Sequence, residues 1–188
     1  MRKIVVGITG ASGAIYGIRL LEVLKLVDDV ETHLVVSPSA GRTIVEETDL
    51  KVDDVCELAD VVYSHRDIGA AISSGSFRTD GMVVAPCSIK SLSGIANSYG
   101  DNLLTRAADV CLKERRPLIL MVRETPLHLG HLELLVRAAQ YGAVIVPPMP
   151  AFYNRPQSVD DIVNHSVGKA LDQLKVQHGL FKRWKETP

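Results

Sequence analysis

The distribution of apolar residues along the chain predicts strands that alternate with amphipathic helices. Short and almost wholly apolar runs occur at 4–8, 32–36, 82–85, 117–122 and 144–146. Such runs are typical of parallel strands that are buried on both faces. Between them, apolar residues recur with helical spacing, as in the stretch from Ile15 to Val27. The alternation predicts an α/β fold with a doubly wound, mostly parallel sheet.

The stretch 52–79 is less regular, and the pattern predicts no strand in it. Val62, Ile68 and Ile72 are expected to be buried there, while the Gly- and Ser-rich part is expected to line a site. Pro86 is expected to stop the strand that precedes it, because proline lacks the N–H group that a sheet ladder needs.

A proline-rich loop and an aromatic tail complete the pattern. The loop 147–156 carries Phe152 and Tyr153, and the only tryptophan, Trp184, follows the last predicted helix. Exposed aromatic rings are costly, so we expect these residues to pack on this domain or on a neighbouring subunit.

Composition narrows the class of protein. The 188 residues fit one domain, 1–188, and the net charge of −1 leaves no basic field for nucleic acid. The apolar runs are too short to span a membrane, and the start Met1-Arg2-Lys3 leads directly into a strand. Three cysteines lie far apart without a CxxC pair, which argues against disulfides and zinc. We therefore expect a cytoplasmic protein.

Small polar residues follow the predicted strands. The first strand runs into the glycine-rich turn Thr9–Gly13, the second into Ser37, and the central one into Ser88 at the start of a helix. In a doubly wound sheet these turns share one edge, where ligands bind. Gly10 and Gly13 would let the backbone approach a ligand at a helix N-terminus that favours negative charge. The turn matches neither GxGxxG nor a P-loop.

Charged residues stand at the end of another buried strand. Arg123 and Glu124 directly follow the run 117–122, where charges are normally paired or functional. His128 and His131 have the spacing to share a helix face, but no recognised metal-ligand motif surrounds them. We expect no metal site.

Several motifs taken together resemble those of the UbiX/Pad1 family of flavin prenyltransferases, among the flavin-binding relatives of the cysteine decarboxylases. The resemblance covers nearly the whole chain. Its motifs are Gly7–Ala14, Asp67–Gly69, Ser74–Phe77, Ala85–Ser88, Ala107–Asp109, Leu112–Pro117, Arg123–Pro126, Phe152–Tyr153 and Pro156–Gln157.

The resemblance implies a single-domain, flavodoxin-like or Rossmann-like three-layer sandwich that binds FMN between subunits of a trimer-based dodecamer, without a metal. It also implies a second substrate, dimethylallyl monophosphate, and a UbiD-type decarboxylase as the partner that receives prenylated FMN. The implied FMN contacts are Gly10, Ala11, Ser12, Ser37, Ser88, Ile89, Lys90, Ser91 and Arg123. The implied phosphate contacts are Lys113, Arg123, Tyr153 and Lys169; many relatives have Arg at the last position.

The implied reaction joins the dimethylallyl group to N5 and C6 of reduced FMN. Fixed cationic donors would stabilise the leaving phosphate as negative charge develops on it. Glu124, with Glu47 as a second carboxylate, resembles the family's acid and base residues, and Ser12 would hydrogen-bond near N5. The aromatic loop and the Trp184 tail would exclude water from the allylic cation.

Two other functions stay open from the sequence. Flavin-dependent decarboxylases of cysteinyl peptides or of phosphopantothenoylcysteine share the fold, but they generally carry a Pro-Ala-Ser-Ala-Asn-Thr motif and a catalytic histidine. The corresponding turn here, Pro86–Ser91, lacks the asparagine. The chain could also be a non-catalytic FMN-binding accessory subunit, but the charged residues from Lys113 to Lys169 would then have little function. Direct decarboxylation of aromatic acids has no support in the chain.

Overall fold

A six-stranded parallel sheet organises the chain, and the computed structural model describes residues 1–185. The strand order is β3-β2-β1-β4-β5-β6. The strands are β1 (Arg2–Ile8), β2 (Val30–Val36), β3 (Val61–Tyr63), β4 (Gly81–Cys87), β5 (Leu118–Val122) and β6 (Val144–Ile145). The helices are α1 (Ala14–Leu24), α2 (Pro38–Glu47), α3 (Val52–Cys56), α4 (Ile89–Ala96), α5 (Leu103–Lys113), α6 (Leu129–Gln140) and α7 (Val159–Gln173), with one 3₁₀ turn at Ala71–Ser73.

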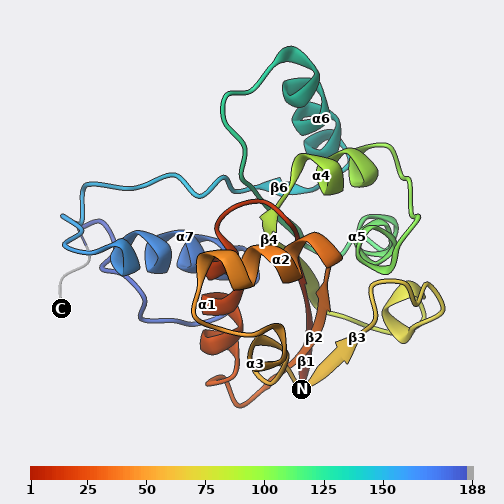
Figure 1. The fold of residues 1–188 in the computed structure, drawn as a ribbon, viewed down its shortest axis with the longest axis horizontal. Coiled ribbons are helices and arrows are strands. Elements are labelled where there is room, and N and C mark those ends of the chain that lie inside the picture. The colour runs from red at the N-terminus through yellow and green to blue at the C-terminus, as the bar shows by residue number, and fades with distance from the viewer. Residues whose placement is uncertain (186–188) are drawn as a thin grey trace.

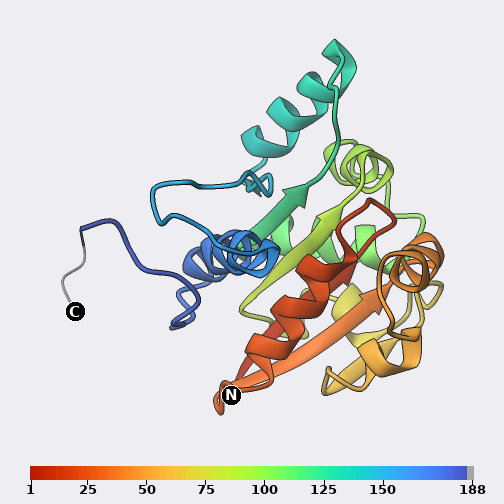
Figure 2. The same cartoon turned by 60° about the vertical axis from the view of Figure 1, so that its left-hand side comes forward.

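Helices cover both faces of the sheet, which gives three layers (Figures 1 and 2). Alternate residues of the central strands enter two separate cores. In β4, Val83 and Ala85 pack with α1 and α7, whereas Met82 and Val84 pack with α4 and α5. The wholly apolar runs of the sequence therefore reflect strands that are buried on both sides. The predicted three-layer α/β sandwich is confirmed.

The strand order determines where a site can form. The chain winds outward from β1 through β2 and β3, and then outward in the other direction through β4, β5 and β6. The direction reverses between β1 and β4, and this is the Rossmann-type order. A crevice opens at such a switch point outside the carboxyl ends of the strands.

Two details of the predicted strands are wrong. Residues 61–63 form the edge strand β3, in a stretch where the pattern predicts no strand. The strand β4 also continues through Pro86 to Cys87, although its register with β5 shifts between Val84 and Cys87. Pro86 is tolerated there because its carbonyl still accepts hydrogen bonds from Thr9, and the shifted register accommodates the missing donor.

Burial in the stretch 52–79 is also partly different from the prediction. Ile72 is buried, but Val62 is 47% exposed and Ile68 is 60% exposed. Val62 lies on the outer strand of the sheet, and Ile68 lies in a turn beyond it, where the single subunit offers no second layer of protein.

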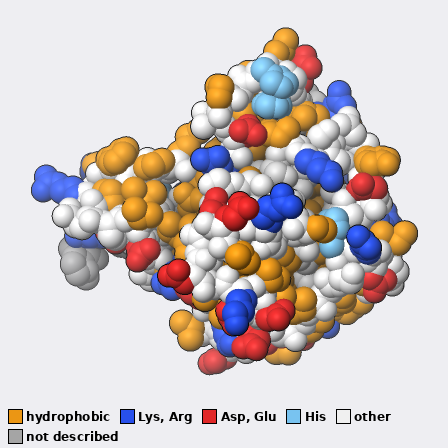
Figure 3. All heavy atoms as spheres, in the orientation of Figure 1, with side chains coloured by type: hydrophobic (Ala, Val, Ile, Leu, Met, Phe, Trp, Pro, Cys, Tyr) orange, Lys and Arg blue, Asp and Glu red, His pale blue; other side chains and the backbone are white. Residues whose placement is uncertain are grey.

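The loop after β6 and the start of α7 form an arm that extends away from the sheet (Figure 1). Hydrophobic side chains gather on this arm, and Phe152 is 72% exposed and Trp184 66% exposed (Figure 3). Trp184 packs edge-on against Tyr153 with ring centroids 5.5 Å apart. The aromatic residues thus contact one another but stay largely open in the single subunit. Within residues 1–185, no helix combines the length and apolar character needed to cross a membrane.

Candidate active site

The carboxyl ends of four neighbouring strands are joined by hydrogen bonds. The Thr9 hydroxyl donates to the Pro86 carbonyl at 2.7 Å and accepts from the Ser88 N–H at 2.8 Å. The Ser37 N–H donates to Ile8 O at 3.0 Å, and the Arg123 N–H donates to Cys87 O at 3.1 Å. The turns after β1, β2, β4 and β5 are therefore fixed relative to one another. We call this region the carboxyl-edge site.

Serine side chains cap the two helices that start there. The Ser37 hydroxyl accepts from the Ala40 N–H at 3.1 Å, and the Ser88 hydroxyl accepts from the Ser91 N–H at 3.3 Å. The Ser88 hydroxyl also donates to the Ser91 hydroxyl at 3.2 Å. Ile89 is half-buried against the core, which anchors the first turn of α4. Both helix N-termini remain directed toward the carboxyl edge, where they favour an anion.

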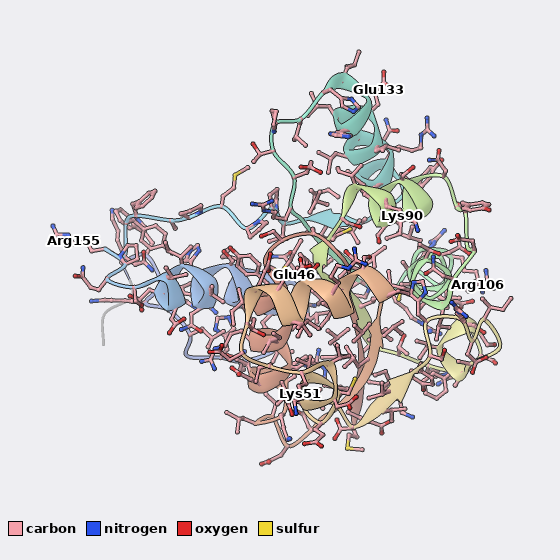
Figure 4. All side chains as sticks on the ribbon, in the orientation of Figure 1. Glu46, Lys51, Lys90, Arg106, Glu133 and Arg155 are labelled. Carbon is pink, nitrogen blue, oxygen red and sulfur yellow. The ribbon has the colours of Figure 1, made fainter. Side chains whose placement is uncertain are left out.

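A cavity of about 730 Å³ opens beside these helix starts. Most of the residues that line it have polar side chains, among them Ser37, Ser39, Ser88, Lys90, Ser91 and His65, and we call it the polar cavity. Lys90 projects from the first turn of α4 (Figure 4). Burial lowers the pKa of His65, as do the nearby positive charges of Lys90 and Arg66, against the opposite effect of Asp101. The cavity thus presents hydroxyl and cationic donors of the kind that a phosphate-bearing polyol requires.

Glu47, at the end of α2, lies against the start of α1. Its carboxylate accepts from the Gly13 N–H at 2.8 Å and from the Ala14 N–H at 3.1 Å. Burial alone would raise the pKa of Glu47. Hydrogen bonding from the Ser12 side chain and from the two backbone groups outweighs burial, and the charge of Arg123 adds to it, so the pKa is lowered. Ser12, Glu47 and Arg123 are therefore brought together.

The glycines of the first turn have two different purposes. Gly13 has φ 100°, a left-handed conformation that side chains rarely adopt, and it starts α1 there. Gly10 faces the first turn of α2, because a Cβ at that position would lie 2.4 Å from the Ser39 side chain. The close approach at Gly10 is thus to the start of α2. Ala11 lies half-buried between them.

Arg123 and Glu124 line a second cavity, of about 460 Å³. Its remaining wall is largely apolar, with Val122, Leu127, Pro147, Pro148 and Met149. The Glu124 carboxylate accepts from the Thr125 N–H at 3.0 Å, and in the described part of the chain it forms no ion pair with Arg123. Because Arg123 and Glu124 do not pair with each other, both charges are available to a ligand.

Lys113 lies away from the carboxyl-edge site. It ends α5 and pairs with Glu114, beside Gly75. The next element, β5, begins at the opposite edge of the sheet and leads to Arg123 five residues later. A strand of that length spans about 16 Å. Within one subunit Lys113 and Arg123 therefore cannot contact the same phosphate group.

Tyr153 and Lys169 form a third group with His165, which we call the α7 cluster. The Tyr153 hydroxyl is 3.2 Å from His165 Nε2, and Lys169 lies one turn further along α7. Lys169 is 3.7 Å from Asp172, a carboxylate that already accepts from Arg183 at 2.6 Å and from His178 at 3.1 Å. Because Arg183 and His178 satisfy Asp172, Lys169 is held only loosely.

The sequence did not indicate two residues of the carboxyl-edge site. In the sequence Thr9 is only the first residue of a turn, yet its buried hydroxyl joins β1 to β4. A hydroxyl directly after an apolar strand is the signal that marks it. His65 lies in an irregular stretch, and no spacing connects it to the helix start that it faces.

The described residues show no arrangement suited to cysteine or metal chemistry. Burial raises the pKa of the Cys87 thiol to about 12, so this cysteine stays protonated despite its place beside Ser88. No group of three or more His, Cys, Asp or Glu side chains within 1–185 is arranged to hold a metal ion. His128 instead caps α6 by accepting from the Gly130 N–H at 3.1 Å, and its ring packs at a tilt against that of His131.

Comparison with known proteins defines the class. Residues 1–171 match the Flavoprotein family. Flavin prenyltransferase UbiX of Escherichia coli is 62% identical over 186 residues, which cover 98% of each chain. The chain therefore belongs to the UbiX family of flavin prenyltransferases.

Two solved structures agree with this assignment. A dodecameric FMN-dependent UbiX-like decarboxylase from Escherichia coli has a TM-score of 0.96 at 52% identity, covering 98% of this chain and 100% of that one. AnUbiX in complex with FMN and dimethylallyl pyrophosphate also has a TM-score of 0.96, at 48% identity, covering 100% of this chain and 99% of the other.

Proposed function

We propose that the protein joins the dimethylallyl group of dimethylallyl monophosphate to N5 and C6 of reduced FMN and so makes prenylated FMN. The observation that carries this proposal is that Ser12, Glu47 and Arg123 come together at the carboxyl edge, where Arg123 also lines the second cavity. A decarboxylase of the cysteinyl-peptide type is not favoured, since the relative at 62% identity is a prenyltransferase.

The polar cavity fits the phosphate and sugar-alcohol parts of FMN. Hydroxyls of Ser37, Ser88 and Ser91 surround two helix N-termini, with Lys90 on the same wall. Backbone N–H groups at a helix start bind phosphate, and serine hydroxyls both donate to and accept from the ribityl hydroxyls. We therefore propose that Gly10, Ala11, Ser12 and Arg123 face the flavin ring, while Ser37 and 88–91 hold the remainder.

The second cavity suits a short prenyl group. Pro147, Pro148 and Met149 supply an apolar wall, and Arg123 places a guanidinium at the same cavity. Ionisation of an allylic phosphate leaves a cation that water would capture, so an apolar wall favours transfer to the flavin. The guanidinium is a bidentate donor to phosphate oxygens where charge develops.

The two carboxylates differ in environment and so suit different tasks. Reduced FMN supplies nucleophilic centres at N5 and C6, and closure of the new ring releases a proton. Glu124, which accepts only from its neighbour's N–H in the described residues, is free to take that proton. Glu47, with its lowered pKa, stays ionised and holds Ser12 in place near N5.

The separation of Lys113 from Arg123 supports a site shared between subunits. We propose that another copy of the chain brings its Lys113, and that the α7 cluster supplies Tyr153 and Lys169 to the same phosphate. The exposed apolar residues of the arm and of α6, such as Phe152, Val136 and Leu129, are surfaces that an oligomer would cover. A trimer-based dodecamer agrees with the dodecameric relative.

The cellular context follows from the product. We propose that the whole chain, 1–188, is one flavin-binding domain, that it acts in the cytoplasm, and that a UbiD-type decarboxylase receives prenylated FMN from it. Cell fractionation tests the location. Activation of a purified apo-decarboxylase by the reaction mixture, with unmodified FMN as the control, tests the partner.

The direct test is anaerobic. Purified protein is mixed with reduced FMN and dimethylallyl monophosphate, and the extracted flavin is analysed by mass spectrometry. We expect a flavin heavier by one prenyl unit. Unchanged FMN in a fully reduced sample would overturn the proposal, and carbon dioxide release from a cysteinyl peptide would then indicate the decarboxylase alternative.

A further inference from the structure

His165 is a buried histidine of α7 that no step of the proposed reaction uses. The residue is 8% exposed. Its Nε2 atom lies 3.2 Å from the Tyr153 hydroxyl, and its ring packs against Phe181 with centroids 4.7 Å apart. The ring is thus held between the arm loop and the tail, with one nitrogen directed at Tyr153.

The other nitrogen determines which tautomer is present. His165 Nδ1 is buried and has no hydrogen-bond partner. If Nδ1 carried the proton, a buried N–H donor would be left unpaired, at a cost of about 1–3 kcal/mol. An unpaired acceptor lone pair is tolerated more readily. Burial, and next the charge of Lys169, lower the pKa of His165 against the opposing charge of Asp172, which disfavours the doubly protonated form. The proton of the neutral ring therefore resides on Nε2.

This tautomer fixes the direction of the Tyr153 hydroxyl. A phenol has one O–H donor and an oxygen that accepts. Since His165 Nε2–H donates to that oxygen, the Tyr153 proton must find an acceptor elsewhere. Tyr153 is 44% exposed, so its O–H is accessible, and Lys169 lies four residues after His165 on the same face of the helix. The two donors suit an anion that both can reach.

We propose that His165 is a positioning residue that turns the Tyr153 hydroxyl toward a phosphate oxygen of the prenyl donor. The proposal rests on the proposed function and extends it to a residue outside the implied phosphate contacts. His165 does not touch the substrate; it acts only through the oxygen of Tyr153. Its removal therefore weakens donor binding and leaves FMN binding unchanged.

A double-mutant cycle tests this by affinity. Dimethylallyl monophosphate is titrated by calorimetry into protein loaded with oxidised FMN, which does not react. His165→Leu is expected to raise the Kd about tenfold, the loss of one hydrogen bond to a charged group. His165→Gln, which retains an N–H donor, is expected to stay within about twofold of the native protein. In the Tyr153→Phe background, His165→Leu should have no further effect.

His131→Leu is the matched control, because His131 also has a buried, unpaired Nδ1 but lies on α6. Its donor affinity should equal that of the native protein. The proposal would be overturned if His165→Leu bound the donor with the native Kd. It would also be overturned if His165→Leu weakened donor binding by the same factor in the Tyr153→Phe background. Failure of the proposed function is distinguishable, because native protein would then bind FMN without binding the donor.

A spectroscopic measurement decides the case if His165→Leu does not fold. Nitrogen-15 NMR of histidine-labelled native protein distinguishes the two neutral tautomers, with His165→Gln used to assign the signal. We expect the proton on Nε2. A proton on Nδ1 would overturn the proposal, because the Tyr153 hydroxyl would then donate to His165.

Discussion

The carboxyl-edge site and the α7 cluster differ in how the chain holds their side chains. At the carboxyl edge, buried parallel strands end together, and backbone hydrogen bonds join their turns directly. In the α7 cluster, the helix α7 packs on the sheet through its apolar side, whereas Tyr153 comes from the loop after β6 and meets the helix at His165. The first region is held by the sheet itself, whereas the second depends on side-chain contacts between a loop and a helix.

This difference separates two tasks. A flavin that binds at the carboxyl edge needs a rigid frame, and the fold supplies it at the switch point of the sheet. A prenyl phosphate must enter and leave, and donors on an arm and on a neighbouring copy can close around it on assembly. Damage to one region should therefore spare the function of the other.

The largest expected effect separates chemistry from flavin binding within the carboxyl-edge site. Glu124→Gln removes the proposed proton acceptor, so kcat should fall about 100-fold to 10,000-fold. FMN affinity, measured by fluorescence quenching, should stay unchanged, since the polar cavity does not include Glu124. Glu133→Gln, on exposed α6 (Figure 4), is the control. An undiminished rate would remove Glu124 from the mechanism.

The next effect tests whether the two regions meet only between subunits. Lys113→Met and Arg123→Met should each lower kcat/KM about 10-fold to 100-fold, through the loss of a charged hydrogen bond to phosphate. When both variants are co-produced, random mixing should restore activity to about one quarter of native, because that share of interface sites holds both native residues. If both residues act from one subunit, every site in the mixture lacks one of them and no activity returns.

A moderate effect is expected from the hydroxyl that joins β1 to β4. Thr9→Val keeps the shape but leaves the Ser88 N–H and the Pro86 carbonyl without this partner, so unfolding free energy should fall by about 1–3 kcal/mol. FMN affinity should fall with it, while donor affinity of the α7 cluster should not. Thr43→Val, whose exposed hydroxyl donates to Ser39 O, is the control. Equal urea midpoints for the two variants would contradict the role of Thr9.

The smallest effect concerns pH. The pKa of Glu47 is lowered from 4.5, so its ionised form contributes stability above that value and loses the contribution as the pH falls through the folded-state pKa. Glu47→Gln should be slightly less stable than native protein at neutral pH, and the two should converge in acid. Denaturation across this range measures the difference, with Glu46→Gln as the baseline for losing one carboxylate. A difference that is constant with pH would exclude the lowered pKa as its cause.

The sequence predicted most of the frame because burial on both faces leaves a simple pattern. The runs at 4–8, 82–85 and 117–122 became the central strands β1, β4 and β5, and their hydroxyl-bearing turns share one edge as expected. Capping explains why Ser37 and Ser88 were identifiable, since both start helices. By contrast, β3 is short and its outer side is exposed, so Val61–Tyr63 carried no distinctive run of buried residues.

The pattern of apolar and polar residues could not predict distances across the sheet. Lys113, Arg123 and Lys169 are similar charges in motifs of one family. Nothing in their spacing reveals that Lys113 ends the helix that precedes β5, whereas Arg123 follows the carboxyl end of that strand. The role of His165 could not be predicted either, because a histidine within an apolar helical stripe is typical of a core residue. Only the three-dimensional contact with Tyr153 and the unpaired Nδ1 give it a purpose.

The carboxylate of Asp172 has a consequence for how the chain is handled in the laboratory. Arg183 and His178, both from the tail, bind Asp172 at shorter distances than Lys169 does and so weaken its pairing with Lys169. A chain shortened to residue 177 would leave Asp172 free to pair more closely with Lys169. The carboxylate would then compete with the substrate phosphate for the Lys169 ammonium group. In such a shortened chain Asp172 would inhibit binding of the substrate. Because the tail has to keep its contacts with Asp172, purification tags are better placed at the amino terminus.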